Sequence, residues 1–294
     1  MNSFSLVKNP SHGFLQVHPT PTKQQIDEYY SKEFYNSGYP GINDSSLDVI
    51  ESDQSYYEGH YDDIIDTVKT ILKVASYSSI DLLDIGCGWA QALAYWQHLG
   101  VTCSGIDPAP EAVSHGQKLG INVCRAEIQN INAFDKKFNA ITLMNVLEHL
   151  PDPELTISMI RADMIQNGGV LVVDVPNEFN QLQLAARDIH ELDDWWVAPP
   201  AHLNYFDASS LTSLLEGNGF EVVSTESSFP MELFMLMGEN YVKQPNLGKI
   251  CHLKRVQFEQ NMRLLGKTKV LRNLYSALAS IGLGRQVMVF AKAV

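Results

Sequence analysis

The chain has 294 residues, 45% of them hydrophobic, so it is long enough to bury a substantial core and does not have the composition of a disordered protein. Its 34 acidic residues against 21 basic ones give a formal net charge of −13, which disfavours nucleic acid as a partner. The four cysteines lie far apart without a C-x-x-C pair, which favours free thiols. No signal peptide and no long apolar run is evident, so we expect a cytoplasmic protein without a membrane span.

Residues 1–75 predict an N-terminal helical cap. Tyrosine-rich helical patterns cover residues 24–35 and 58–72. A stretch rich in Gly, Pro, Asn and Ser separates them at residues 36–46.

From residue 80 onward, short apolar runs alternate with helical patterns, which is typical of a parallel sheet with crossover helices. The strands expected from this pattern are residues 81–85, 101–106, 121–124, 138–144, 170–175, 220–224 and 286–293. The helices expected between them are residues 90–99, 110–119, 153–166 and 208–215, the last with Asp207 as N-cap, followed by a mainly helical insertion at 229–281.

The expected fold is therefore α/β, with a Rossmann-like, seven-stranded, mostly parallel sheet and helices on both faces. The expected division is an N-terminal cap at 1–75, a core at 76–228, a helical insertion at 229–282 and the last core strand at 283–294.

The first predicted strand ends in a glycine turn that opens a helix, in the sequence Asp84-Ile-Gly-Cys-Gly88. Glycines allow a ligand to approach the backbone closely, and the N–H groups at a helix start favour a polar or anionic group. Two glycines alone are also compatible with an ordinary tight turn between a strand and a helix.

Asp107 follows Gly86 by 21 residues and ends the second predicted strand. A carboxylate at this position can accept hydrogen bonds from both hydroxyls of a ribose. A dinucleotide site would have a third glycine where this chain has Gln91. The pattern thus favours a nucleoside without phosphates, and it disfavours the alternative of a nicotinamide-dependent oxidoreductase.

Three blocks together resemble the class I S-adenosylmethionine-dependent methyltransferases, in particular the small-molecule O-methyltransferases of the ubiquinone-biosynthesis type. The blocks are the turn at residues 84–88, Gly-Ile-Asp-Pro at 105–108, and Asn-Val-Leu-Glu-His-Leu-Pro-Asp-Pro at 145–153. The likeness covers roughly residues 80–223 and the last strand. It implies S-adenosylmethionine as cofactor, S-adenosylhomocysteine as product and O-methylation of a metabolite, natural product or sugar. N- or C-methylation, and cofactor binding without catalysis, remain alternatives.

The resemblance also implies roles for individual residues. The cofactor-binding candidates are Gly86, Cys87 and Gly88 at the methionine part, Asp84 holding the turn, Asp107 with Pro108 at the ribose, Ala126, Glu127 and Ile128 at the adenine, and Met144 or Asn145 at the methionine amino group. For Glu127, a solvated loop carboxylate is an equally good interpretation.

Glu148 and His149 resemble the Glu-His pair that holds a divalent metal in ubiquinone-type enzymes, where a further Glu stands three positions earlier. This chain has Asn145 there, and two ligands make a poor dedicated site. We therefore expect no metal, with His149 as a structural residue or a secondary acid-base candidate.

The segment after the fifth predicted strand carries the main catalytic candidate, His202. A neutral imidazole suits proton removal from a hydroxyl acceptor, although a histidine that anchors the loop is the competing interpretation. The expected substrate-binding residues are Trp195, Trp196 and Tyr205 near it and Tyr30 and Tyr35 in the cap. The resemblance implies that such a cap closes over the cofactor pocket.

Charge is unevenly distributed along the chain. Residues 243–285 carry nine Lys and Arg against one Glu, a net +8, which leaves −21 for the remainder. A solvated helix face is the commoner meaning of such a segment. It is also suited to dock a phosphorylated or carrier-bound substrate or a membrane surface.

Independently of this segment, a second copy of the chain is a further candidate partner.

Overall fold

The computed structural model describes residues 4–22, 24–26, 53–128 and 134–294. The chain divides into two compact units. We call residues Tyr57–Val175, Thr212–Ser224 and Met288–Val294 the core unit. We call residues Met1–Tyr56, Pro176–Leu211 and Thr225–Val287 the second unit.

A seven-stranded sheet organises the core unit, with strand order β5-β4-β3-β6-β7-β10-β9. Its strands are β3 (Asp81–Ile85), β4 (Thr102–Asp107), β5 (Asn122–Arg125), β6 (Phe138–Met144), β7 (Ile165–Pro176), β9 (Phe220–Ser227) and β10 (Gln286–Ala293). The five strands from β5 to β7 pair in parallel, so their carboxyl ends lie at one edge. The expected fold class is confirmed.

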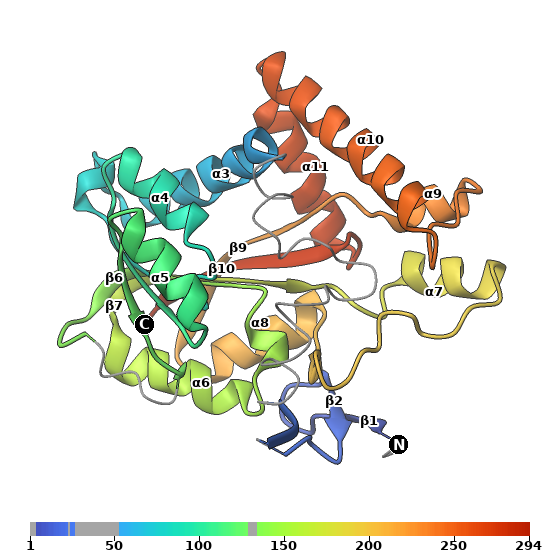
Figure 1. The fold of residues 1–294 in the computed structure, drawn as a ribbon, viewed down its shortest axis with the longest axis horizontal. Coiled ribbons are helices and arrows are strands. Elements are labelled where there is room, and N and C mark those ends of the chain that lie inside the picture. Colours follow the sequence, from blue (N-terminus) through green and yellow to red (C-terminus); the bar gives the residue numbers. More distant parts are fainter. Residues whose placement is uncertain (1–3, 23, 27–52, 129–133) are drawn as a thin grey trace. The chain divides into compact units, whose positions relative to one another are not determined.

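Helices cover both faces of this sheet (Figure 1), as expected for parallel strands that are apolar on both sides. The helices are α3 (Gln54–Leu72), α4 (Gln91–His98) and α5 (Pro110–Lys118) on one face and α6 (Pro153–Met159) and α8 (Ala208–Gly217) on the other. Short 3-10 turns lie at Tyr77–Ser79 and Leu147–His149, and a π-helical turn lies at Ile160–Met164.

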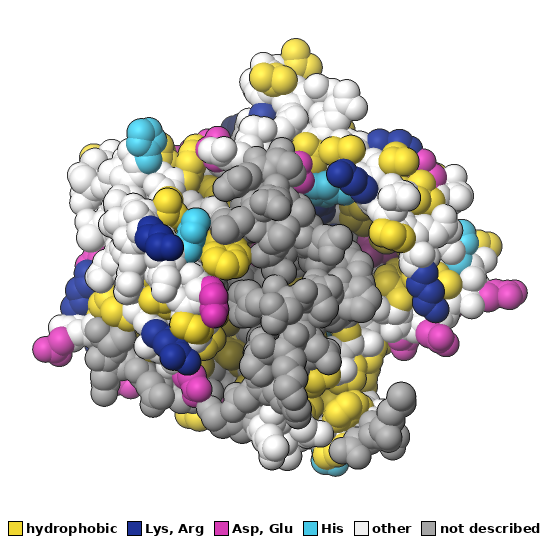
Figure 2. Space-filling view, viewed as in Figure 1, with side chains coloured by type: hydrophobic (Ala, Val, Ile, Leu, Met, Phe, Trp, Pro, Cys, Tyr) yellow, Lys and Arg dark blue, Asp and Glu magenta, His cyan; other side chains and the backbone are white. Residues whose placement is uncertain are grey.

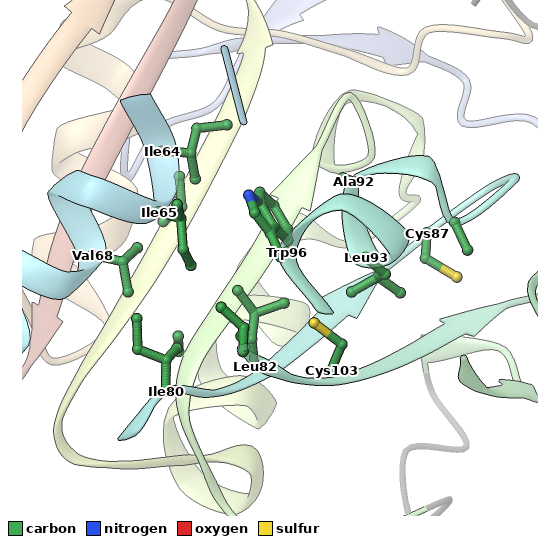
Figure 3. Close-up of a cluster of buried hydrophobic side chains, with 14 of the residues drawn as sticks. Ile64, Ile65, Val68, Ile80, Leu82, Cys87, Ala92, Leu93, Trp96 and Cys103 are labelled. Carbon is green, nitrogen blue, oxygen red and sulfur yellow. The ribbon is translucent and has the colours of Figure 1, made fainter. Parts of the chain in front are cut away.

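Trp96 of α4 is fully buried within a hydrophobic cluster of the core unit. Figure 3 shows it between Ile64 and Ile65 of α3 and Leu82 of β3. Its indole nitrogen donates a hydrogen bond to the carbonyl of Tyr61, 2.9 Å away, so the buried polar atom is satisfied. This cluster fixes α3 and α4 on the strand that leads into the glycine turn.

The fifth strand and the helix before it differ from expectation. β7 begins at Ile165 rather than at residue 170, and the α-helix expected at 153–166 ends at Met159 and continues as a π-helical turn. The pairing of β7 with β6 shifts register between Phe138 and Ala140, and Gly168 has a φ of +78°. The Asn-Gly-Gly sequence thus forms an irregularity inside the strand and not the turn that precedes it.

The second unit contains a small sheet in the order β1-β2-β8, built from β1 (Ser5–Lys8), β2 (Leu15–His18) and β8 (Asn204–Tyr205). It also contains α7 (Gln181–Ile189), α9 (Glu232–Leu236), α10 (Pro245–Leu264) and α11 (Thr268–Ser280), the last three within the expected insertion. The small sheet and α7 were not expected. Strands of two to four residues give too little periodicity to detect. The nine-residue helix α7 is capped by the side chain of Asn180 and buries Gln183 and Ala186, so its buried face carries no large apolar side chains.

None of the helices in the described ranges has the length and apolarity needed to cross a bilayer. On the face drawn in Figure 2, basic and acidic side chains are both scattered among polar and apolar ones. The acidic net charge is therefore not gathered into one patch on that face.

Candidate functional site

The turn after β3 has a backbone that only small residues adopt easily. Gly86 has a φ of +73° and Gly88 a φ of +49°. A Cβ atom on Gly86 would lie 2.5 Å from Cγ2 of Val146, whereas one on Gly88 would meet nothing within 4 Å. Gly86 is thus required by packing, and Gly88 leaves open space beside the turn.

Asp107 joins this turn to the end of β4. Its Oδ2 accepts the N–H of Gly88 at 2.9 Å, and its Oδ1 accepts the N–H of Ala109 at 2.8 Å. The residue is only 5% exposed. A carboxylate has about four acceptor positions, so Asp107 can keep both backbone donors and also accept the hydroxyls of a ribose.

Asp84 lies inside the sheet just before the turn. Its Oδ1 accepts the hydroxyl of Thr142 on the neighbouring strand β6 at 2.7 Å. Burial raises the pKa of Asp84 to about 7, the Thr142 hydrogen bond opposes this, and the charge of Asp107 adds to it. Asp84 of β3 is therefore hydrogen-bonded to β6 and interacts electrostatically with Asp107, the ribose-binding candidate.

The end of β6 presents the next candidates. Met144 is half-buried against the main hydrophobic cluster. Asn145 is exposed, has a φ of +54°, and donates its N–H to the carbonyl of Asp174 at 2.8 Å. Because parallel strands end at one edge, Met144 and Asn145 lie on the same edge of the sheet as the turn after β3.

The segment after β5 continues this edge. The N–H of Ala126 donates to the carbonyl of Asp107 at 3.3 Å. Glu127 is exposed and Ile128 is buried. Pro108 is exposed, and its carbonyl accepts Nε of Arg125 at 3.1 Å.

The side chain of Cys87 is packed inside the core unit. A Cβ on Gly105 would lie 2.8 Å from its Sγ, so Gly105 makes the room that this thiol occupies. Burial raises the pKa of the thiol, and the charges of Asp84 and Asp107 raise it further. Like the glycines on either side of it, Cys87 therefore offers a ligand only its main chain.

Glu148 and His149 form the 3-10 turn that follows β6. His149 Nε2 lies 3.7 Å from Glu148 Oε1, and the Glu148 carboxylate is 2% exposed. Burial and the charge of Glu148 raise the pKa of Asp174. Glu148 thus lies close to His149 in the turn after β6 and interacts electrostatically with Asp174 of β7.

In the second unit, His202 is 11% exposed and its Nδ1 lies 3.6 Å from Oε1 of the buried Glu178. Tyr205 fixes the same loop, because its hydroxyl accepts the N–H of Ala198 and donates to the carbonyl of His202, both at 3.1 Å. The Tyr205 contacts fix the backbone of this loop, and the imidazole faces the Glu178 carboxylate within ion-pair distance but beyond hydrogen-bond length.

Trp196 and Tyr205 belong to a hydrophobic cluster with Val17 of β2, against which Trp195 also packs. The rings of Trp195 and Trp196 meet edge to face at 4.7 Å. Both tryptophans therefore supply packing between the loop and the small sheet. Tyr30 and Tyr35 lie outside the described residues, as does most of the helix expected at 24–35.

Sequence reasoning missed two residues of this site. Thr142 is fully buried and donates its hydroxyl to Asp84, and its signal was one hydroxyl among the apolar residues at 140–144. Val146 packs against Gly86. No sequence pattern identifies this contact, because it forms only when the loop after β6 lies beside the loop after β3.

A parallel sheet with a glycine turn after β3 and a carboxylate fixed at the end of β4 defines the Rossmann-like nucleoside-binding proteins. Residues 55–225 match the family described as "Methyltransferase domain", and the chain belongs to this family. The expected class, an S-adenosylmethionine-dependent methyltransferase, is confirmed by this membership.

Curated relatives share part of the sequence. The chain is 26% identical over 159 residues to a ubiquinone biosynthesis O-methyltransferase of Dinoroseobacter shibae, which covers 50% of this chain and 62% of that protein. It is 31% identical over 107 residues to the protein of the same name from Glaesserella parasuis, covering 33% and 45%. The matches thus span less than two thirds of these relatives.

Among solved structures, a magnesium protoporphyrin IX methyltransferase from Synechocystis PCC 6803, crystallised with bound SAH, is similar with a TM-score of 0.55. The identity is 10%, and the match covers 93% of this chain and 100% of that one. This likeness supports the fold.

Proposed function

We propose that this protein transfers a methyl group from S-adenosylmethionine to a hydroxyl oxygen of a small molecule. The observation that carries the proposal is the carboxylate of Asp107, held by the backbone of Gly88 and Ala109 at the end of β4. A ribose is the ligand group that such a fixed carboxylate suits. The choice of oxygen is supported by the partial relatives, which are O-methyltransferases.

The cofactor would lie along the carboxyl edge of the parallel strands. Asp107 would accept the ribose hydroxyls, and the open space at Gly88 would admit the methionine part. Ala126 and Ile128 would line the adenine, and Asn145 would face the methionine amino group. Asp84 would act indirectly, by holding the turn through Thr142 and the strand pairing.

Bound S-adenosylmethionine would supply an electrophilic methyl group, and the acceptor oxygen would bond to that carbon as its bond to the sulfonium sulfur breaks. S-adenosylhomocysteine, the methyl ether and one proton are the products. Most of the acceleration in such a displacement comes from holding donor and acceptor aligned. We assign the proton to His202, whose imidazole has the Glu178 carboxylate within ion-pair distance.

The proposal is tested by incubating the protein with S-adenosylmethionine labelled in the methyl group and a panel of phenols, catechols and sugars. Label in an ether-linked methyl group, identified by mass spectrometry and NMR, supports O-methylation. Label found on nitrogen or carbon, or formation of no methylated product with any acceptor, contradicts it.

A further inference from the structure

The turn between α10 and α11 exposes a cluster of apolar side chains. Leu264 is 84% exposed and Leu265 is 71% exposed, more than any other large hydrophobic side chain in the described part of the chain. Val270 and Leu274, on the first turns of α11, are 55% and 44% exposed. Single exposed apolar residues are normal on a protein surface, but several so close together mark a surface that binds something. We call residues 263–274 the hairpin tip.

The hairpin tip is ordered by hydrogen bonds of its own. Gly266 has a φ of +66°, the left-handed conformation that ends a helix, and the N–H of Lys267 donates to the carbonyl of Met262 at 2.8 Å. Behind the turn, the hydroxyl of Tyr275 donates to the buried carboxylate of Glu259 at 2.8 Å and so joins α11 to α10. The tip lies at the top of Figure 1, and Figure 2 shows hydrophobic side chains gathered at this place.

Positive charge accompanies the exposed leucines. Residues 260–294 contain no Asp or Glu. Lys267 and Lys269 are exposed, and neither has an ion-pair partner among the described residues. Arg272, by contrast, forms an ion pair with Glu226. The two lysines therefore add uncompensated positive charge directly beside the apolar cluster.

We propose that the hairpin tip binds the surface of a lipid bilayer that contains anionic phospholipids. Leu264, Leu265 and Val270 would enter the boundary between headgroups and acyl chains, which removes their apolar area from water. Lys267 and Lys269 would lie among the anionic headgroups, which attract cations near the surface. Such contact involves one leaflet and requires no helix that crosses the bilayer.

The distribution of charge favours a bilayer over a second copy of the chain. In a symmetric dimer the same surface meets itself, so Lys267 and Lys269 of the two copies would approach one another without a carboxylate between them. Another protein would need a pocket for two leucines that is lined with carboxylates, whereas a bilayer offers apolar depth and negative charge without a matching shape. Residues outside 243–285 carry −21, so an anionic bilayer repels the remainder of the chain and attracts this segment.

The inference goes beyond the proposed methyl transfer and is tested by vesicle flotation of the full chain. One set of vesicles contains equal parts of phosphatidylcholine and phosphatidylglycerol, and the other contains phosphatidylcholine alone. The chain should bind the mixed vesicles at least about tenfold more tightly, and raising the salt from about 0.1 M to about 0.5 M should reduce this preference. Because S-adenosylhomocysteine binding is measured separately, failure here is distinguishable from failure of the proposed function.

Two double variants separate the apolar from the electrostatic contribution. Leu264→Gln with Leu265→Gln should weaken binding to the mixed vesicles by about tenfold or more, because the inserting side chains are lost. Lys267→Gln with Lys269→Gln should weaken it by about tenfold or more and should also reduce its dependence on salt. These side chains are exposed, so Tm should change little in either variant.

The matched control is Ile189→Gln with Lys118→Gln. Both side chains are exposed and lie outside the hairpin tip, and Ile189 is 69% exposed, close to the value for Leu265. This variant should bind the mixed vesicles like the wild type.

The proposal is overturned if the wild type binds neither kind of vesicle or binds both equally. It is also overturned if both double variants at the tip bind like the wild type. A chain that ignores vesicles but self-associates in sedimentation velocity, and becomes monomeric when the two leucines are replaced, would show that the tip is an interface between protein chains.

Discussion

The backbone N–H of Gly88 donates a hydrogen bond to Oδ2 of Asp107 at 2.9 Å. The bond joins the two sequence features that first indicated a nucleoside site, the glycine turn after β3 and the acidic end of β4. It orients the carboxylate before any ligand arrives, and orientation in advance reduces the free-energy cost of binding.

Asp107→Ala should weaken S-adenosylhomocysteine binding by about 100-fold, because charge-assisted hydrogen bonds to two hydroxyls are lost. Calorimetric titration measures the change. Glu111→Ala, an exposed acidic residue in the first turn of α5, is the matched control and should bind normally. Equal affinities for Asp107→Ala and the wild type would remove Asp107 from the site.

Gly86→Ala should lower the free energy of unfolding by about 2 kcal/mol or more, because the new Cβ clashes with Val146 and the φ of +73° disfavours alanine. Adding Val146→Ala should restore part of this loss in a double-mutant cycle. Denaturant unfolding of the three variants measures the coupling. A cycle with no coupling would show that the contact is not what makes Gly86 necessary.

Gly88→Ala should behave differently, because its Cβ enters open space. Its stability should fall by only about 1 kcal/mol, the cost of a left-handed backbone at alanine. Its affinity for S-adenosylhomocysteine should nevertheless fall about tenfold or more, since the methyl group occupies space assigned to the cofactor. Unchanged affinity would place the methionine part elsewhere.

Asp84→Asn should become more stabilising as pH rises from 5 to 8. The pKa of Asp84 rises from 3.8, its ordinary value, to about 7 in the folded protein. Protonated Asp84 therefore favours folding, and this contribution is lost as the pH rises from about 3.8 to about 7. Above pH 7 the variant avoids a buried charge worth up to about 4 kcal/mol. Asn still accepts the Thr142 hydroxyl.

Urea unfolding of the wild type and Asp84→Asn at pH 5 and pH 8 measures this difference. Asp163→Asn is the control, because Asp163 is exposed and should show no comparable trend. A difference between Asp84→Asn and the wild type that stays flat or declines toward pH 8 would contradict the account of Asp84.

His202→Ala should reduce methyl transfer to a hydroxyl acceptor by about 100-fold or more, the usual contribution of a positioned base, and should flatten the acid side of the pH-rate profile. Cofactor affinity should be unchanged. His190→Gln is the control, since His190 contacts the carbonyl of Met235 in the same unit. Normal turnover in His202→Ala would leave His202 as the residue that anchors its loop.

The core was predictable because its signals are periodic. β3, β6 and β10 have the expected bounds, since short, mostly apolar runs mark them: Leu82 and Leu83 in β3, residues 140–144 in β6 and residues 287–291 in β10. The small sheet was not predictable, because β8 has two residues and pairs with β2, which lies 188 residues earlier in the chain. Such pairing depends on tertiary structure and leaves no local pattern.

The site was predictable where chemistry depends on sequence spacing and not where it depends on packing. Gly88 and Asp107 are placed by the strand and turn pattern, and the structure joins them directly. Thr142 and Val146 act through their neighbours Asp84 and Gly86, and these contacts exist only once β6 lies beside β3.

The most direct test is a calorimetric titration of the purified chain with S-adenosylmethionine, S-adenosylhomocysteine and NADH in parallel. We predict one binding event for each of the two sulfur compounds, at micromolar or tighter dissociation constants typical of a buried cofactor, and none for NADH. Binding of NADH alone, or of none of the three, would contradict the account.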